Sequence, residues 1–198
     1  MPSAPLAPVS YEPIKAVRTL GSAAAFPAAI RAPEAATQTF QLGVPTMLNG
    51  SGYIVEWTTG AANVVYGVSS EPAHDLTTAG TPQDESEGTP PNQPSAITTA
   101  IGAWPRDGNI GEYMANGLTV FSIALKAGQT FTQALIIAGT YYGLTKDATS
   151  HFWYLDTTVT SGNSAVANLI GVDPTCPNTA TGGCRVFFQF IESQRYFQ

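Results

Sequence analysis

The chain has 198 residues, which is enough for one domain of ordinary size, or for one domain with a long tail. Only 11% of the residues are charged, against about 25% in an average soluble domain, and the formal net charge is −6. An acidic chain without a basic stripe is a poor nucleic-acid binder, because phosphate contacts supply most of that affinity. No apolar run approaches the roughly 18 residues of a membrane span, so we expect neither nucleic acid nor a membrane as a partner.

The composition favours short strands and many turns over long helices. Glycine and proline contribute 19 and 15 residues, and lysine is scarce. A surface this poor in charge suits a protein that is packed against another molecule, but a secreted β protein with a surface rich in threonine and serine fits equally well. The start of the chain lacks the basic stretch and apolar core of a secretory signal, so we expect none.

Residues 1–37 are predicted to form an extended arm. Six prolines between positions 2 and 33 each remove a backbone donor and disfavour helix at the preceding residue. The segment also carries apolar side chains throughout, which favours an arm that becomes ordered on a neighbouring subunit over a flexible tail. Deleting 1–37 should then abolish attachment without unfolding the body. The side chains expected to contact the neighbour are Leu6, Tyr11, Ile14, Val17, Leu20, Phe26 and Ile30.

The pattern from residue 38 onward predicts one compact β domain, residues 38–198. Asn49-Gly50-Ser51-Gly52 is a strong turn signal between two short apolar runs. Residues 70–95 interrupt the pattern with a proline-rich acidic loop, which we expect to face solvent because clustered like charges are costly to bury. Strands are expected on either side of the loop at 40–42, 44–48, 53–57, 63–69 and 97–101.

The second half of the chain carries the clearest strand signals. The strongest are 118–125 and 129–138, which Gly128 separates at hairpin distance. About ten short strands without a long helix predict a mainly β fold, a small antiparallel β-barrel or a sandwich. The remaining strands are expected at 141–144, 151–155, 165–172 and 185–191, the last with Val186, Phe188 and Phe190 on one face.

The sequence predicts no catalytic, metal-binding or cofactor-binding residues. The chain has two histidines, His74 and His151, and a lone histidine beside aromatic residues is more often packed than catalytic. The run from Gly139 to Lys146 has the wrong spacing for a phosphate loop, and bulky tyrosines where backbone must approach phosphate. The acidic cluster at 84–87 lacks the spacing of a calcium loop and is interpreted as a solvated charge run. Because the chain has fourteen acidic residues, the sequence does not exclude a pair of carboxylates placed as in a glycosidase.

Cys176 and Cys184 are the two cysteines, and they flank a short loop. Zinc is not expected there, because no histidine accompanies them. A disulfide would close the loop and stabilise the fold by about 2–3 kcal/mol in an oxidising environment. Two free buried thiols are an equal alternative. Asn49-Gly50-Ser51 also matches a glycosylation sequon, although a turn needs no such role.

Several runs resemble segments of the head decoration, or auxiliary capsid, proteins of tailed bacteriophages. The resemblance covers roughly residues 38–198 apart from the loop at 70–95, and its motifs are structural rather than catalytic. The runs are Gln38 to Pro45 followed by a Gly-Tyr strand, Gly139 to Asp147, Trp153-Tyr154-Leu155-Asp156, Ile170-Gly171-Val172-Asp173-Pro174, and Gly183 to Phe190.

The resemblance implies a small β-barrel or β-tulip-like domain on the outer surface of the capsid, in the virion, often as a homotrimer. The partners that it implies are the major capsid protein and copies of the chain itself. The function that it implies is structural: the protein decorates the shell and stabilises it through many weak contacts. It carries over no active site and no cofactor, and the cysteine pair and the proline-rich arm depart from the family pattern.

The alternative function is a receptor-binding or carbohydrate-binding β module of a tail fibre or a cell-surface protein. Aromatic side chains could stack on sugars in such a module, although most aromatics in a β protein belong to its core. A position inside the head is disfavoured, because the acidic charge would face packaged DNA. The aromatic candidates are Trp57, Trp104, Tyr141, Tyr142, Trp153 and Tyr154.

Overall fold

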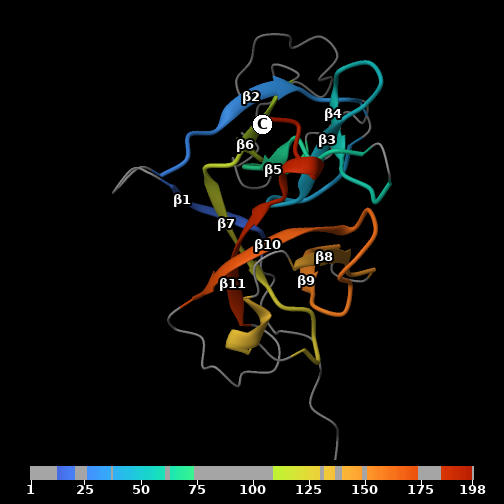
Figure 1. Cartoon of the computed structure of the whole chain (residues 1–198). Helices are drawn as coiled ribbons and strands as arrows, with labels where there is room; N and C mark the ends of the chain where they lie inside the picture. The colour runs from blue at the N-terminus through green and yellow to red at the C-terminus, as the bar shows by residue number, and fades with distance from the viewer. Residues whose placement is uncertain are drawn as a thin grey trace, which may run out of the picture.

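The structure of the chain, a computed structural model, describes residues 13–20, 26–36, 38–60, 63–73, 109–129, 132–136, 140–148, 151–173 and 184–197. It contains 47% strand and 5% helix, which confirms the predicted mainly β fold. The strands form two antiparallel sheets, one of six strands and one of five (Figure 1). Within the described ranges, no helix is long and apolar enough to cross a membrane.

The six-stranded sheet combines strands from the second half of the chain with the N-terminal strand. Every neighbouring pair in it is antiparallel. The sheet curls, because an isolated parallel bridge joins Leu125 to Leu155 and the Lys126 amide donates to the Leu155 carbonyl at 2.9 Å. In order across the sheet, the strands are β1 (Lys15–Thr19), β7 (Thr119–Ala124), β11 (Arg185–Phe190), β10 (Ala165–Val172), β8 (Tyr141–Lys146) and β9 (Trp153–Asp156).

The five-stranded sheet is built mainly from the first half of the chain and curls in the same way. A parallel bridge joins Glu34 to Ile54, and the Ala35 amide donates to the Ile54 carbonyl at 2.9 Å. Two short 3₁₀ helices, η3 (Gln133–Leu135) and η4 (Glu192–Gln194), also lie in the described ranges. The strand order is β2 (Ile30–Pro33), β6 (Asn109–Met114), β5 (Gly67–Ser69), β3 (Pro45–Leu48) and β4 (Ile54–Glu56).

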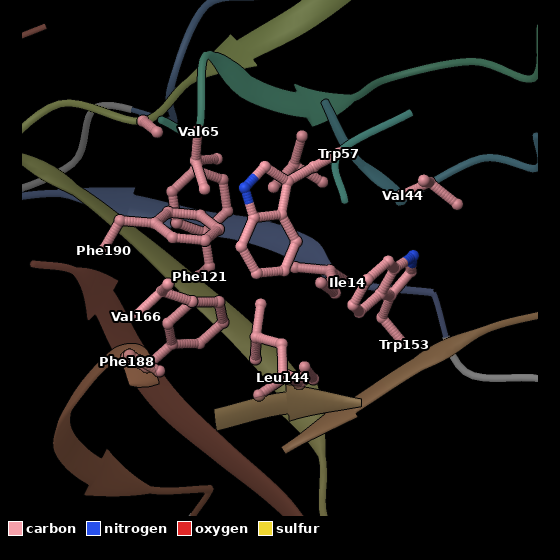
Figure 2. Close-up of a cluster of buried hydrophobic side chains, with 14 of the residues drawn as sticks. Ile14, Val44, Trp57, Val65, Phe121, Leu144, Trp153, Val166, Phe188 and Phe190 are labelled. Carbon is pink, nitrogen blue, oxygen red and sulfur yellow. The ribbon is translucent and has the colours of Figure 1, made fainter. Parts of the chain in front are cut away.

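One hydrophobic core contains side chains from both sheets. Trp57, which follows β4, packs against Trp153 of β9 with ring centroids 5.2 Å apart. Phe121, Phe188 and Phe190 of the six-stranded sheet form a second aromatic group, with centroid separations of 5.1 to 5.8 Å (Figure 2). Buried and half-buried positions alternate along β11, so the predicted apolar face of Val186, Phe188 and Phe190 is confirmed.

The N-terminal segment differs from the predicted arm. β1 pairs with β7 and β2 pairs with β6, so the described residues from Pro13 to Ala36 belong to the body, and the boundary predicted at residue 38 is wrong for them. Pro13 precedes β1 and Pro33 ends β2, which lies at a sheet edge where a missing backbone donor is tolerated. The prolines therefore bound these strands instead of preventing them.

Two other strand predictions fail. The segment predicted as the strand 129–138 contains η3, and β7 pairs with β1 and β11 instead of forming a hairpin across Gly128. A short apolar run cannot be assigned to strand or helix by periodicity alone. Residues 40–42 form no strand, although Phe40 is buried, and β6 was not predicted. The expected strand at 97–101 lies outside the described residues.

Candidate functional site

The residues predicted to contact a neighbour lie in different environments. Ile14 is 3% exposed and belongs to the core, so its side chain is not available to a partner. Val17 is half-buried in β1, and Ile30 packs against the core. By contrast, Leu20 and Phe26 are 37% and 62% exposed. Of the predicted contact residues, Ile14, Val17 and Ile30 therefore support the fold, whereas Leu20 and Phe26 remain accessible to a partner.

Phe26 lies against β6, where its ring meets the edge of Tyr113 at 5.9 Å. Leu6 and Tyr11, the two other predicted contact residues, lie outside the described residues.

Three glutamates are buried in and beside the five-stranded sheet: Glu34 after β2, Glu71 after β5, and Glu112 in β6. Glu71 belongs to the loop that was predicted to face solvent, and that prediction is wrong for this residue. Its Oε1 accepts hydrogen bonds from the Gly111 amide at 2.5 Å and from Arg31 Nη1 at 3.1 Å. A cation and an amide compensate the buried carboxylate, which is the condition under which such burial is tolerated.

Glu112 is fully buried and has no matching cation among the described contacts. Thr46 Oγ1 donates to its Oε2 at 2.7 Å, and its Oε1 has no hydrogen-bond partner. Burial raises the pKa of the Glu112 carboxyl group well above its usual range, and the Glu34 and Glu71 carboxylates raise it further. The group therefore stays protonated to higher pH than an ordinary glutamate. Because it has no exposed surface, it offers nothing to a substrate in this conformation.

Asp156, at the end of β9, organises one end of the six-stranded sheet. It accepts hydrogen bonds from Lys126 Nζ at 2.6 Å, from Gln129 Nε2 at 2.6 Å and from Thr158 Oγ1 at 2.6 Å. Burial alone would raise its pKa, but the bonds from Lys126, Thr158 and Gln129 outweigh burial and hold the pKa of Asp156 far below its ordinary value. A carboxylate held this way is a structural anchor of the β7–β9 contact.

A polar bridge joins the two sheets beside the tryptophan pair. The Glu56 carboxylate of β4 lies 2.7 Å from Lys146 Nζ of β8, and it accepts a hydrogen bond from Trp153 Nε1 at 3.0 Å. Residues 141–146, which superficially resemble a phosphate loop, form strand β8, and Lys146 ends it beside a carboxylate. This lysine is therefore occupied by a structural contact.

The remaining chemistry-bearing residues are placed as follows. Cys184 is buried and disulfide-bonded, while Cys176 lies outside the described residues. His151 is exposed, rather than packed as predicted, and has a left-handed backbone with φ 61°. The described residues contain no cluster of three potential metal ligands. His74 and the acidic run at 84–87 fall outside the described ranges.

The aromatic candidates for sugar stacking are mostly occupied by the core. Trp57, Tyr142, Trp153 and Tyr154 are each at most 8% exposed. The Tyr142 hydroxyl donates to the Leu135 carbonyl at 2.8 Å, which further commits that ring to the fold. Tyr141 is 41% exposed, and Trp104 lies outside the described residues.

The exposed apolar side chains include a group where β1 ends beside the link between β6 and β7, which connects the two sheets (Figure 1). The Leu20 amide donates to the Leu118 carbonyl at 2.8 Å, and the two side chains are 37% and 55% exposed. Gly117 lies against the Arg195 guanidinium, and Tyr196 beside it is 51% exposed. We call Arg18, Leu20, Leu118, Arg195 and Tyr196 the junction surface.

Tyr196 is held in place by its neighbours. Its amide donates to the Val65 carbonyl at 2.8 Å, and its ring lies 5.5 Å from Tyr66 and 5.1 Å from Phe197. The sequence pattern pointed to Leu20 but not to Leu118, Arg195 and Tyr196, because the segments that meet there lie roughly 80 to 100 residues apart in the sequence. The local sequence carries no signal for such a meeting.

Comparison with models of protein families, with curated proteins and with solved structures found no match to this chain.

Proposed function

We propose that the chain is a structural virion protein that decorates the outside of a tailed-phage capsid and stabilises the shell through contacts with the major capsid protein. The observation that carries this proposal is the exposed apolar pair Leu20 and Leu118 in a chain with 11% charged residues. Exposed apolar patches on soluble domains commonly mark sites of protein contact. The buried carboxylates, by contrast, are engaged in the fold.

Weak contacts are sufficient for such a function. Many linked copies that bind a lattice together attach more strongly than one copy alone, so each copy needs only a small interface with the shell. A protein that binds only the assembled shell also stabilises the shell, because binding shifts the equilibrium toward the bound state. We expect copies of the chain to associate with one another, as trimers, at the same positions.

The residues that carry the resemblance to decoration proteins support the fold of the six-stranded sheet. Trp153 and Phe188 lie in the core, and Asp156 anchors β9. A Cβ at Gly143 would collide with Val159, so this position of β8 requires glycine. The resemblance therefore concerns how the body is built, and the attachment surface has to be argued separately.

The test is the copy number and position of the chain in purified particles. Quantitative mass spectrometry of the particles should find hundreds of copies, and electron microscopy should place them at regular points of the outer lattice. A handful of copies at one vertex would instead indicate a tail or fibre protein. Absence from the particles would refute the proposal.

A further inference from the structure

The junction surface differs from the rest of the described chain in how its cations are placed. Arg31, Lys126 and Lys146 each lie within 3.1 Å of a carboxylate oxygen. Among the residues that the structure describes, Arg18 and Arg195 form neither an ion pair nor a side-chain hydrogen bond. Two arginines without a partner in the described part of the chain therefore belong to the junction surface of a chain whose net charge is −6.

The two arginines flank the exposed apolar residues. Arg18 is exposed in β1 and lies two residues before Leu20, opposite Val120 of β7. Arg195 is half-buried beside Gly117, the residue before Leu118, and its Nε is buried without a hydrogen-bond partner. Arg18 thus lies near Leu20 along β1, and the Arg195 guanidinium lies beside the residue before Leu118.

We infer that the junction surface docks onto a protein surface on which carboxylates flank an apolar patch. Arginine and tyrosine are enriched at the energetic centres of protein interfaces. Planar guanidinium groups bind carboxylates bidentately, which fixes orientation as well as affinity. The inference rests on the proposed function, in which the partner is the major capsid protein.

Nucleic acid is a less suitable partner for the same surface. Affinity for nucleic acid grows with the number of phosphates that are neutralised, and two arginines on an acidic chain neutralise few. Leu20 and Leu118 would also stay exposed on a phosphate backbone. A carboxylate-rimmed apolar patch satisfies both the cations and the leucines.

The experiment measures cosedimentation of the full chain with purified shells of the major capsid protein at 50 and 500 mM salt. Leu20→Ser with Leu118→Ser, and separately Arg18→Gln with Arg195→Gln, should each weaken binding about tenfold or more. The charge-preserving pair Arg18→Lys and Arg195→Lys should keep most of the affinity. Tyr53→Ser, which removes an exposed aromatic from the β3–β4 turn of the other sheet, should leave binding unchanged.

Thermal unfolding of each variant separates loss of binding from loss of folding. Arg18→Gln alone tests the charge at an exposed position. If the wild type binds shells and both junction variants bind equally well, the inference is overturned and the proposed function stands. No wild-type binding to shells would overturn both. Binding to a labelled duplex DNA that disappears in Arg18→Gln with Arg195→Gln would overturn the carboxylate partner in favour of phosphate.

Discussion

At the scale of single residues, the carboxyl groups show how environment decides the behaviour of one side-chain type. Glu71 and Asp156 are buried, and each accepts hydrogen bonds from a cation and from an amide. Glu112 accepts a hydrogen bond from the Thr46 hydroxyl on one carboxyl oxygen, and its other oxygen has no hydrogen-bond partner. Burial therefore favours the neutral form of Glu112, whereas the hydrogen bonds that Asp156 accepts favour its charged form.

Glu112 should make the protein less stable as pH rises. Its pKa is higher in the folded state than in the unfolded state, so stability is fully present below about pH 4 and falls as pH rises through the folded pKa. The slope from this one group reaches at most about 1.4 kcal/mol per pH unit. Glu112→Gln should therefore unfold at higher denaturant concentration than the wild type at pH 7–9.

The comparison is measured by urea unfolding at several pH values, with Glu192→Gln as the control, because Glu192 lies in an exposed 3₁₀ turn. Equal stability of wild type and Glu112→Gln across this range would contradict the buried neutral form.

Asp156 should have the opposite pH dependence. Its folded pKa is depressed, so the stability that it contributes is present above about pH 4 and is lost as pH falls through the folded pKa. Asp156→Asn should cost roughly 2–3 kcal/mol at pH 7, because charge-assisted bonds from Lys126 and Gln129 are weakened. In acid-unfolding curves, the difference in the free energy of unfolding between Asp156→Asn and wild type should shrink toward pH 2. A difference that stays constant would contradict a charged Asp156.

At the scale of elements, the N-terminal strands carry the clearest structural test. Deleting residues 1–37 removes β1 and β2, which pair with β7 and β6, so we now expect the truncated protein to lose its cooperative unfolding transition. The matched point variants are Ala32→Asp, at a core position that is 5% exposed, and Ala29→Asp, at an exposed position three residues earlier.

Ala32→Asp should destabilise the fold by several kcal/mol, on the order of the cost of burying an unpaired charge, and Ala29→Asp should have little effect. Circular dichroism during thermal unfolding measures the stability of both variants. A truncated protein that melts like the full chain would mean that β1 and β2 contribute nothing to the body.

The sequence predicted elements well where the local pattern carries the information. β11 carries three phenylalanines and Val186 with clear alternation, and β10 is rich in apolar residues. The Asn49 side chain closes the turn that follows it by accepting hydrogen bonds from the Ser51 and Tyr53 amides. β2 contains Arg31 and Pro33, and β6 contains Gly111 and Glu112. These residues obscure the alternation of apolar and polar positions that marks a strand. Those strands exist because distant partners pair with them, which a local pattern does not encode.

The candidate site follows the same division. Exposed leucines at 20 and 118 carry no mark in the sequence that distinguishes them from core leucines. Glu71 and Arg31 are 40 residues apart, so their pairing, and the burial that it permits, depends on the register of β2 with β6. Contacts of this kind become visible only when the fold is known.

At the scale of the whole molecule, the shared core predicts that both sheets unfold together. Trp57 comes from one sheet and Trp153 from the other, and the Glu56–Lys146 bridge lies beside them. Trp57→Ala should cost about 3–5 kcal/mol and shift a single transition that backbone and side-chain probes report alike. Tyr53→Ala, at an exposed position just before β4, is the control. Two separate transitions would show that the sheets fold independently.

The parallel bridges that join β7 to β9 and β2 to β4 have a consequence for a protein that crowds on a surface. An open sheet edge invites a strand from the next molecule, and that risk grows with local concentration. Here the carbonyl groups of Leu155 and Ile54 already accept hydrogen bonds from Lys126 and Ala35 of the same chain. At these two positions the backbone is therefore not available for pairing with a strand of a neighbouring copy.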